Sequence, residues 1–200
     1  ADLDREDIQI YEDGVRQQVK NFATEKETPL TIGIVIDLSP SQNGFEDENA
    51  YVALSFLKRI LRDQDRVFVV AFGNNIRLVS PPGNSLSDVE KALEATREKI
   101  KGLPRVGPAV ERKGGSAVLD AMYWPTQEFL SKVNGRKALI MIGDGKENAS
   151  KKRTSEVVEL LQNNDVLFYG LDNGGQEMDG SQELHNRMPL IADETGGHEF

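Results

Sequence analysis

The chain has 200 residues, 38% hydrophobic and 28% charged, so it can form a folded domain with a buried core rather than a disordered segment. Its 24 basic and 33 acidic residues give a net charge of -9, which argues against a nucleic-acid-binding protein with a basic face. The absence of cysteine excludes disulfides, thiolate catalysis and zinc–thiolate sites. No apolar run approaches the roughly 20 residues that a membrane-spanning helix needs, so we expect no membrane span.

The first 28 residues differ in pattern from the rest. Two short runs, 7–11 and 15–22, flank Glu12-Asp13-Gly14, and an Asp-Gly pair at such a place predicts a β-hairpin because glycine supplies the positive φ of a type I′ turn. A lone hairpin is marginal in water, so this one either packs on the main domain or belongs to a preceding β-domain. We expect a hairpin and linker over 1–28 and one domain over 29–200.

From residue 29 onward, strand patterns and helix patterns alternate. Apolar runs bounded by turn residues predict strands at 31–36, 66–72, 76–80, 136–142, 166–171 and 198–200. Amphipathic patterns predict helices at 46–62, 86–101, 115–133 (with Pro125 expected to kink or split it), 150 or 154 to 163, and 181–195. Strands separated by helices imply right-handed crossovers. The expected fold class is therefore α/β: a mostly parallel sheet with one short antiparallel edge strand and helices on both faces.

The strand at 31–36 stops abruptly at polar residues. Asp37, Ser39 and Ser41 follow it at alternate positions, where their side chains can converge on one point. A strand buried on both faces delivers such residues to the carboxyl edge of the sheet, where open α/β folds bind ligands. Three hard oxygen atoms on one loop indicate a hard cation such as Mg²⁺. The alternative is that Asp37 and Ser39 only end the strand and cap the next helix.

Two further positions carry the same chemistry. Ser116 opens a helix behind Gly114 and Gly115, and Asp144 follows a strand as apolar as the first. In a doubly wound sheet the two strand ends can be neighbours, and Ser116 can reach the same crevice. Two carboxylates and three hydroxyls, without imidazole or thiolate, fit Mg²⁺, Mn²⁺ or Ca²⁺ and disfavour zinc and copper.

These three segments resemble the metal-ion-dependent adhesion site of the von Willebrand factor type A family. The resemblance rests on Asp-Leu-Ser-Pro-Ser at 37–41, Gly-Gly-Ser-Ala-Val-Leu-Asp-Ala at 114–121 and Gly-Asp-Gly at 143–145. The stretch 5–14 and the Glu-Thr-Gly-Gly at 194–197 are similar to a bacterial group of the family typified by acidobacteria. The resemblance implies a Rossmann-like, doubly wound domain over 29–200 with the cation at the top of the sheet.

The resemblance also implies a role for each residue of the site. Ser39, Ser41 and Ser116 would be hydroxyl ligands, and Asp37 and Asp144 would bind the cation directly or through water. The sequence departs from the family pattern without deleting a ligand. The departures are Ser116 in place of the usual threonine, Pro40 in place of a small residue, and Gly143 in place of serine.

Neighbouring residues are candidates for supporting roles. Asp120 and Gly115 would support the ligands from behind, although Asp120 could equally pair with a neighbour. Arg112, Lys113 and Lys146 fall in loops that could form the rim of this face and steer an acidic ligand. Ordinary solvated charge is the alternative explanation for these three basic residues.

The predicted function is that of a non-enzymatic, divalent-cation-dependent protein-binding domain. Two carboxylates balance the charge of a divalent cation, and a partner's Asp or Glu can complete its coordination. The alternative is a structural or assembly module with the metal optional and its interface elsewhere, for example on the hairpin. Metal-assisted hydrolysis lacks a general base, because both aspartates are committed to the metal, and no nucleotide-binding or serine-hydrolase motif is present. Export to the periplasm, cell surface or medium is implied by the resemblance alone.

Overall fold

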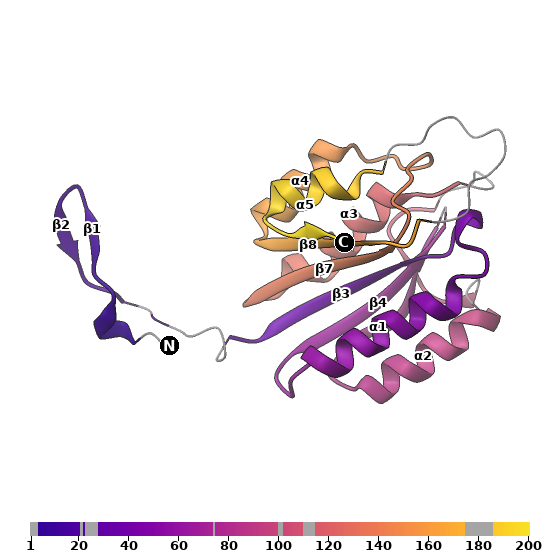
Figure 1. Ribbon diagram of the computed structural model, residues 1–200, viewed down its shortest axis with the longest axis horizontal. Coiled ribbons are helices and arrows are strands. Elements are labelled where there is room, and N and C mark those ends of the chain that lie inside the picture. Colours follow the sequence, from indigo (N-terminus) through magenta and orange to yellow (C-terminus); the bar gives the residue numbers. More distant parts are fainter. Residues whose placement is uncertain are drawn as a thin grey trace.

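The fold has a seven-stranded sheet between two layers of helices, preceded by a two-stranded hairpin (Figure 1). The computed structural model describes residues 4–20, 22, 28–73, 75–99, 102–109, 115–174 and 186–200. The strands are β1 (Ile10–Glu12), β2 (Val15–Gln17), β3 (Leu30–Asp37), β4 (Arg66–Phe72), β5 (Ile76–Gly83), β6 (Arg105–Val106), β7 (Arg136–Gly143), β8 (Val166–Asp172) and β9 (His198–Glu199). The helices are α1 (Glu46–Ile60), α2 (Leu86–Lys99), α3 (Val118–Glu128), α4 (Thr154–Asn163) and α5 (Met188–Thr195), with short 3₁₀ turns at Arg5–Asp7, Pro40–Gln42 and Leu130–Lys132.

The order of strands places β3 at the centre of the sheet. The order is β6-β5-β4-β3-β7-β8-β9, and every pair is parallel except those that β5 makes with β4 and β6. The chain runs from β3 outward through β4 to β6 and then returns to β7 on the other side of β3. The strand order therefore reverses between β3 and β7, and open α/β sheets bind ligands in the crevice at such a point.

The two faces of the sheet have separate hydrophobic cores. Apolar side chains of α1 and α2 pack on one face, around Ile34, Leu57 and Val69. Those of α3, α4 and α5 pack on the other face, around Phe68, Met141 and Leu161. Because β3 is covered on both faces, its apolar run is continuous rather than alternating. The predicted α/β fold class, with helices on both faces, is confirmed.

Three elements differ in extent from the sequence-based expectation. The antiparallel strand β5 is longer than expected, and β6 pairs along its outer side. Helix α3 continues through Pro125 as far as Glu128, because the proline is buried in the core and packing offsets the missing N–H. Helix α5 begins only at Met188, since a proline in its first turn favours the start of a helix. Residues 181–185, expected to belong to it, lie outside the described residues.

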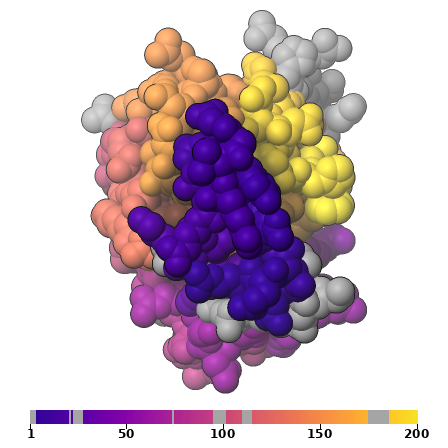
Figure 2. Space-filling view, turned by 90° about the vertical axis from the view of Figure 1, so that its left-hand side faces the viewer, coloured from indigo at the N-terminus to yellow at the C-terminus, as the bar shows by residue number. Residues whose placement is uncertain are grey.

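The hairpin of β1 and β2 forms at the predicted place. Asp13 and Gly14 have φ values of 51° and 80°, the positive values that a type I′ turn requires. Its apolar side chains face solvent, with Tyr11 56% and Val15 63% exposed. The hairpin stands at the amino end of β3, away from the carboxyl ends of the strands, and Figure 2 shows it in front of that end of the domain. The division of the chain at residue 28 stays a prediction.

Candidate metal centre

Two aspartates meet at the carboxyl ends of β3 and β7. Asp37 ends β3 and Asp144 directly follows β7, and the parallel register pairs Ile36 with Ile142 just before them. Both carboxylates are buried, with exposed fractions of 0% and 1%. A Cβ atom on Gly143 would lie 2.5 Å from the Cβ atom of Asp37, so glycine permits the close approach of the two strand ends.

Ser39 and Ser116 contact the Asp37 carboxylate, and Ser41 contacts Ser39. The backbone N–H of Ser39 donates to its Oδ1 atom at 2.7 Å, and the Ser116 hydroxyl lies 3.4 Å from its Oδ2 atom as a donor. The Ser39 and Ser41 hydroxyl oxygens are 3.1 Å apart. Ser39 and Ser116 are buried and Ser41 is half-buried. The structure thus brings together all five residues that the sequence nominated as metal ligands.

The electrostatics of this cluster favour a cation. Burial raises the pKa of Asp37 to about 6, and the charge of Asp144 contributes to the rise, although hydrogen bonds from Ser39 and Ser116 act against it. The Oδ2 atom of Asp144 is buried and has no hydrogen-bond partner within the described structure. A divalent cation between the two carboxylates would remove both unfavourable features, so these residues fit Mg²⁺ or a similar ion.

The donor set differs from that of a cluster rich in carboxylate or imidazole. Among the described residues, no three His, Cys, Asp or Glu side chains gather where they could hold a metal. The candidate site has only two carboxylates, and its remaining protein oxygens come from hydroxyls. Neutral oxygen donors suit hard cations and would leave a divalent ion with no excess of negative charge around it.

Ser116 is held by its backbone from the loop that follows β7. Its N–H donates to the Asn148 side-chain oxygen at 2.8 Å, and its carbonyl accepts from the N–H groups of Asn148 and Ala149, both at 3.2 Å. Gly115, with φ of 105°, lies against the same loop, and a Cβ atom there would be 2.7 Å from the Asn148 oxygen. Gly115 thus permits a close backbone approach that a side chain would block, and its supporting role at the site stays a prediction.

Comparison with known proteins identifies the fold family. The family model described as the von Willebrand factor type A domain matches residues 30–198. This chain belongs to the von Willebrand factor type A (VWA) family. Domains of this family typically mediate protein interactions, often with a metal site. No curated protein has a sequence that matches the chain.

Solved structures of low sequence identity share the VWA fold. BatB from Bacteroides thetaiotaomicron is 16% identical with a TM-score of 0.61, over 85% of this chain and 88% of that one. A von Willebrand factor type A protein from Catenulispora acidiphila is 19% identical with a TM-score of 0.60, over 86% and 38%. Proximal thread matrix protein 1 from the mussel byssus, described with a zinc-occupied metal-ion-dependent adhesion site, is 21% identical with a TM-score of 0.53, over 72% and 36%.

The remaining nominated residues of the VWA domain lie at different distances from the site. Asp120, in the first turn of α3, accepts hydrogen bonds from the loop after β7 and none from the five nominated ligands. The Lys146 N–H donates to the Asp144 Oδ1 atom at 3.1 Å, and Lys146 forms a β-bridge with Asn186. Arg112 and Lys113 lie outside the described residues, so their place on the rim stays a prediction.

Sequence reasoning missed the residues of the loop after β7 that hold the site in place. Glu147, Asn148 and Ser150 all contact the segment 116–120. In the sequence they resemble ordinary polar residues of a solvated loop. Their positions three, four and six residues after Asp144 are the one signal that could have indicated them, because that spacing keeps them close to a nominated ligand.

Proposed function

We propose that this VWA domain binds a protein partner through a divalent cation held by Asp37, Ser39, Ser41, Ser116 and Asp144. The observation that carries the proposal is the buried Asp144 Oδ2 atom, which has no hydrogen-bond partner among the described residues. A second buried carboxylate, that of Asp37, lies close enough for the two charges to repel each other. Two like charges without a cation are an unfavourable arrangement for a folded protein. Mg²⁺ is the expected ion, with Mn²⁺ and Ca²⁺ as substitutes, because all the donors are hard oxygens.

The charge of this donor set defines the kind of partner. Two carboxylates neutralise a divalent cation, whereas the three hydroxyls add no charge, so the bound ion keeps an affinity for another anion. A carboxylate from a partner's Asp or Glu would complete the coordination that water otherwise supplies. Burial keeps the two aspartates away from bulk water, and the backbone contacts of Ser116 hold its segment in place.

We propose binding rather than catalysis for the same site. Hydrolysis would need a carboxylate or imidazole free to act as general base. Both aspartates of the cluster are assigned to the cation, and Ser39, Ser41 and Ser116 have no histidine or further carboxylate in hydrogen-bond contact within the described structure other than Asp37.

The first test is metal binding by the isolated chain. Titration calorimetry with Mg²⁺, Mn²⁺ and Ca²⁺ should show one site, and Asp37→Ala should abolish it while the circular dichroism spectrum stays that of the wild type. Asp193→Ala is the matched control, because Asp193 is an exposed aspartate near the end of α5. Absence of binding of all three ions at millimolar concentration by the wild type would refute the proposal.

The second test concerns the partner. Proteins captured by the chain from the source cell should be released by a chelator and should not be retained by the Asp37→Ala variant. Capture that a chelator does not affect would instead favour an assembly module with the metal optional. The exposed apolar side chains of the hairpin, Ile10, Tyr11 and Val15, favour that second candidate.

We also propose that the protein is exported. The resemblance to exported VWA proteins supports this, and one structure of similar fold, 15% identical, is described as an aerotolerance-related membrane protein from Bacteroides fragilis. Within the described part of this chain, no helix is long and apolar enough to cross a membrane. Fractionation of the source cell with an antibody to the domain tests the proposal, and detection in the cytoplasm alone would contradict it.

A further inference from the structure

The loop after β7 caps the start of helix α3. The residue before α3, Ala117, has no side chain that can accept a hydrogen bond, so the first N–H groups of the helix need acceptors from elsewhere. The N–H of Leu119 donates to the Glu147 Oε2 atom at 2.9 Å, and that of Asp120 donates to the Ser150 hydroxyl at 3.0 Å. Side chains about 30 positions later in the sequence therefore do what an N-cap residue usually does.

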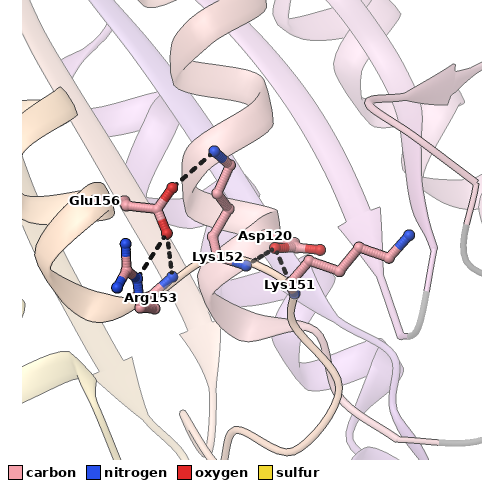
Figure 3. Close-up of polar contacts among 5 residues, drawn as sticks. All are labelled: Asp120, Lys151, Lys152, Arg153 and Glu156. Carbon is pink, nitrogen blue, oxygen red and sulfur yellow. Dashed lines mark hydrogen bonds and ion pairs between the residues drawn. The ribbon is translucent and has the colours of Figure 1, made fainter.

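Helix α3 in turn holds the loop. The Oδ1 atom of Asp120 accepts the N–H groups of Lys151 and Lys152 at 3.0 and 2.9 Å, just before α4 begins (Figure 3). The start of α3 and the loop between β7 and α4 thus interlock, since each supplies acceptors to N–H groups of the other. Asp120, expected to support the ligands from behind, makes this contact with the loop, and its support of the metal site stays a prediction.

Glu147 accepts four hydrogen bonds, three from within the loop after β7 and one from the first turn of α3. Its Oε1 atom accepts the N–H groups of Ala149 and Ser150 at 2.8 and 2.7 Å, and its Oε2 atom accepts the Ser150 hydroxyl at 2.6 Å as well as Leu119. A carboxylate that accepts four hydrogen bonds restrains the loop, and the bond from Leu119 ties the loop to α3.

Both segments joined by this carboxylate carry nominated ligands. Ser116 lies three residues before Leu119, and Asp144 lies three residues before Glu147. The adjacent Asn148 holds the backbone of Ser116 on both its N–H and its carbonyl side. If the loop moved, the Ser116 hydroxyl and the Asp144 carboxylate would move independently, and the geometry that a small octahedral cation demands would be lost.

We propose that Glu147 is a positioning residue that sets the affinity of the metal site by locking the Ser116 segment to the Asp144 loop. The inference rests on the proposed function, because the affinity concerned is that of the proposed cation site. Residues that orient metal ligands without binding the metal typically change affinity by about 10- to 100-fold when they are replaced. A loss of that size is expected here.

The test compares two glutamate variants in the whole chain. Mn²⁺ titration calorimetry on Glu147→Ala, at a temperature where the variant is folded, should show affinity reduced by about 10- to 100-fold. Glu159→Ala, an exposed position on α4, is the matched control and should bind as the wild type does. A melting temperature that falls while Mn²⁺ affinity stays unchanged would overturn the proposal, because Glu147 would then be only a helix cap.

Amide hydrogen exchange in the presence of a chelator gives a readout that needs no metal. The amides of Ser116 and Leu119 should exchange faster in Glu147→Ala than in the wild type or in Glu159→Ala. Unchanged exchange, with Mn²⁺ binding intact in the wild type, would overturn the positioning role alone. No Mn²⁺ binding by the wild type, with exchange altered as expected, would instead overturn the proposed function and leave the lock between the two segments standing.

A second variant covers the case in which Glu147→Ala does not fold. Asn148→Ala removes the acceptor of the Ser116 N–H and leaves the contacts of Glu147 in place. It should lower Mn²⁺ affinity in the same direction and speed exchange at Ser116, with Asn163→Ala on the exposed side of α4 as its control. Wild-type affinity in Asn148→Ala would contradict the lock.

Discussion

A buried aspartate lies at each end of β3, Asp65 beside its first residue and Asp37 as its last, and the two carboxylates have opposite surroundings. At the amino end, Asp65 accepts the N–H of Leu30 at 2.9 Å, the N–H of Arg62 at 3.0 Å and two bonds from the Arg62 guanidinium at 2.9 and 2.8 Å. At the carboxyl end, Asp37 has no cationic side chain among its described contacts and faces Asp144. Asp65 is thus paired with a cation of the protein, whereas Asp37 has no such pairing among its described contacts.

The pKa values of the two groups reflect this difference. Burial alone would raise the pKa of Asp65, but hydrogen bonds from Arg62 and Leu30 lower it to about 2. Burial and a second carboxylate raise the pKa of Asp37 to about 6. The comparison separates a carboxylate that stabilises the fold from one whose charge the fold tolerates, and the second kind marks functional sites more often than the first.

The largest effect on stability is expected at the amino end of β3, from replacing Asp65. Asp65→Asn removes the ion pair with Arg62 and should lower the free energy of unfolding by about 3 kcal/mol, because the buried Asp65 carboxylate loses charge-assisted hydrogen bonds and its new amide N–H₂ would face the donors of Arg62. Urea unfolding at pH 7 measures it. Asp63→Asn, an exposed position two residues earlier, is the control. A loss as small as that of the control would mean that the ion pair contributes nothing to the fold.

Replacing the aspartate at the carboxyl end of β3 should stabilise the metal-free protein rather than destabilise it. In the presence of a chelator, Asp37→Asn should raise the free energy of unfolding by about 2 kcal/mol at pH 7, because it removes a buried charge next to Asp144. The same variant should lose the stabilisation that millimolar Mg²⁺ gives to the wild type. Unfolding curves with and without Mg²⁺ measure both effects. Destabilisation without metal would contradict the interpretation of Asp37 as an uncompensated charge.

As the pH rises, ionisation of Asp65 should stabilise the fold and ionisation of Asp37 should destabilise it. The folded-state pKa of Asp65 is below its ordinary value of 3.8, so its contribution of about 2 kcal/mol is present above pH 4 and is lost as the pH falls toward 2. The folded-state pKa of Asp37 is raised, so its penalty is absent below about pH 4 and develops as the pH rises through 6. Unfolding of the chelated protein from pH 2 to 7 checks both.

Each variant provides an internal check on this pH dependence. The stability advantage of Asp37→Asn should disappear below about pH 4, and the deficit of Asp65→Asn should shrink between pH 4 and pH 2. A difference between Asp37→Asn and wild type that does not change with pH would show that its origin is packing rather than charge.

The strands and the nominated ligands could be predicted from the sequence because their signals are local. One aspartate ends β3 and another directly follows β7, and a short continuous apolar run bounded by turn residues indicates a strand buried on both faces. The hairpin turn at Asp13-Gly14 was predictable for the same reason, since the residue types carry the backbone conformation.

The contacts that hold the site could not be predicted because they join distant segments. Glu147 and Asn148 look like ordinary loop residues until α3 is placed beside them, about 30 residues away in the sequence. The path of α3 through Pro125 was also unpredictable, since burial in the core outweighs the local preference of proline. Tertiary packing decided both cases.

Gly143 tests whether the close spacing of β3 and β7 at their carboxyl ends controls metal affinity. In the sequence it was only a departure from the family's usual serine, but a Cβ atom there would lie 2.5 Å from the Asp37 Cβ atom. Gly143→Ala should therefore displace Asp37 and lower Mn²⁺ affinity at least tenfold in calorimetry, while overpacking lowers the free energy of unfolding by only about 1 kcal/mol. Gly83→Ala, where the nearest atom is 3.8 Å away, should change neither. Because the expected cost in affinity exceeds the cost in stability, wild-type affinity in Gly143→Ala would mean that the distance between β3 and β7 does not control the site.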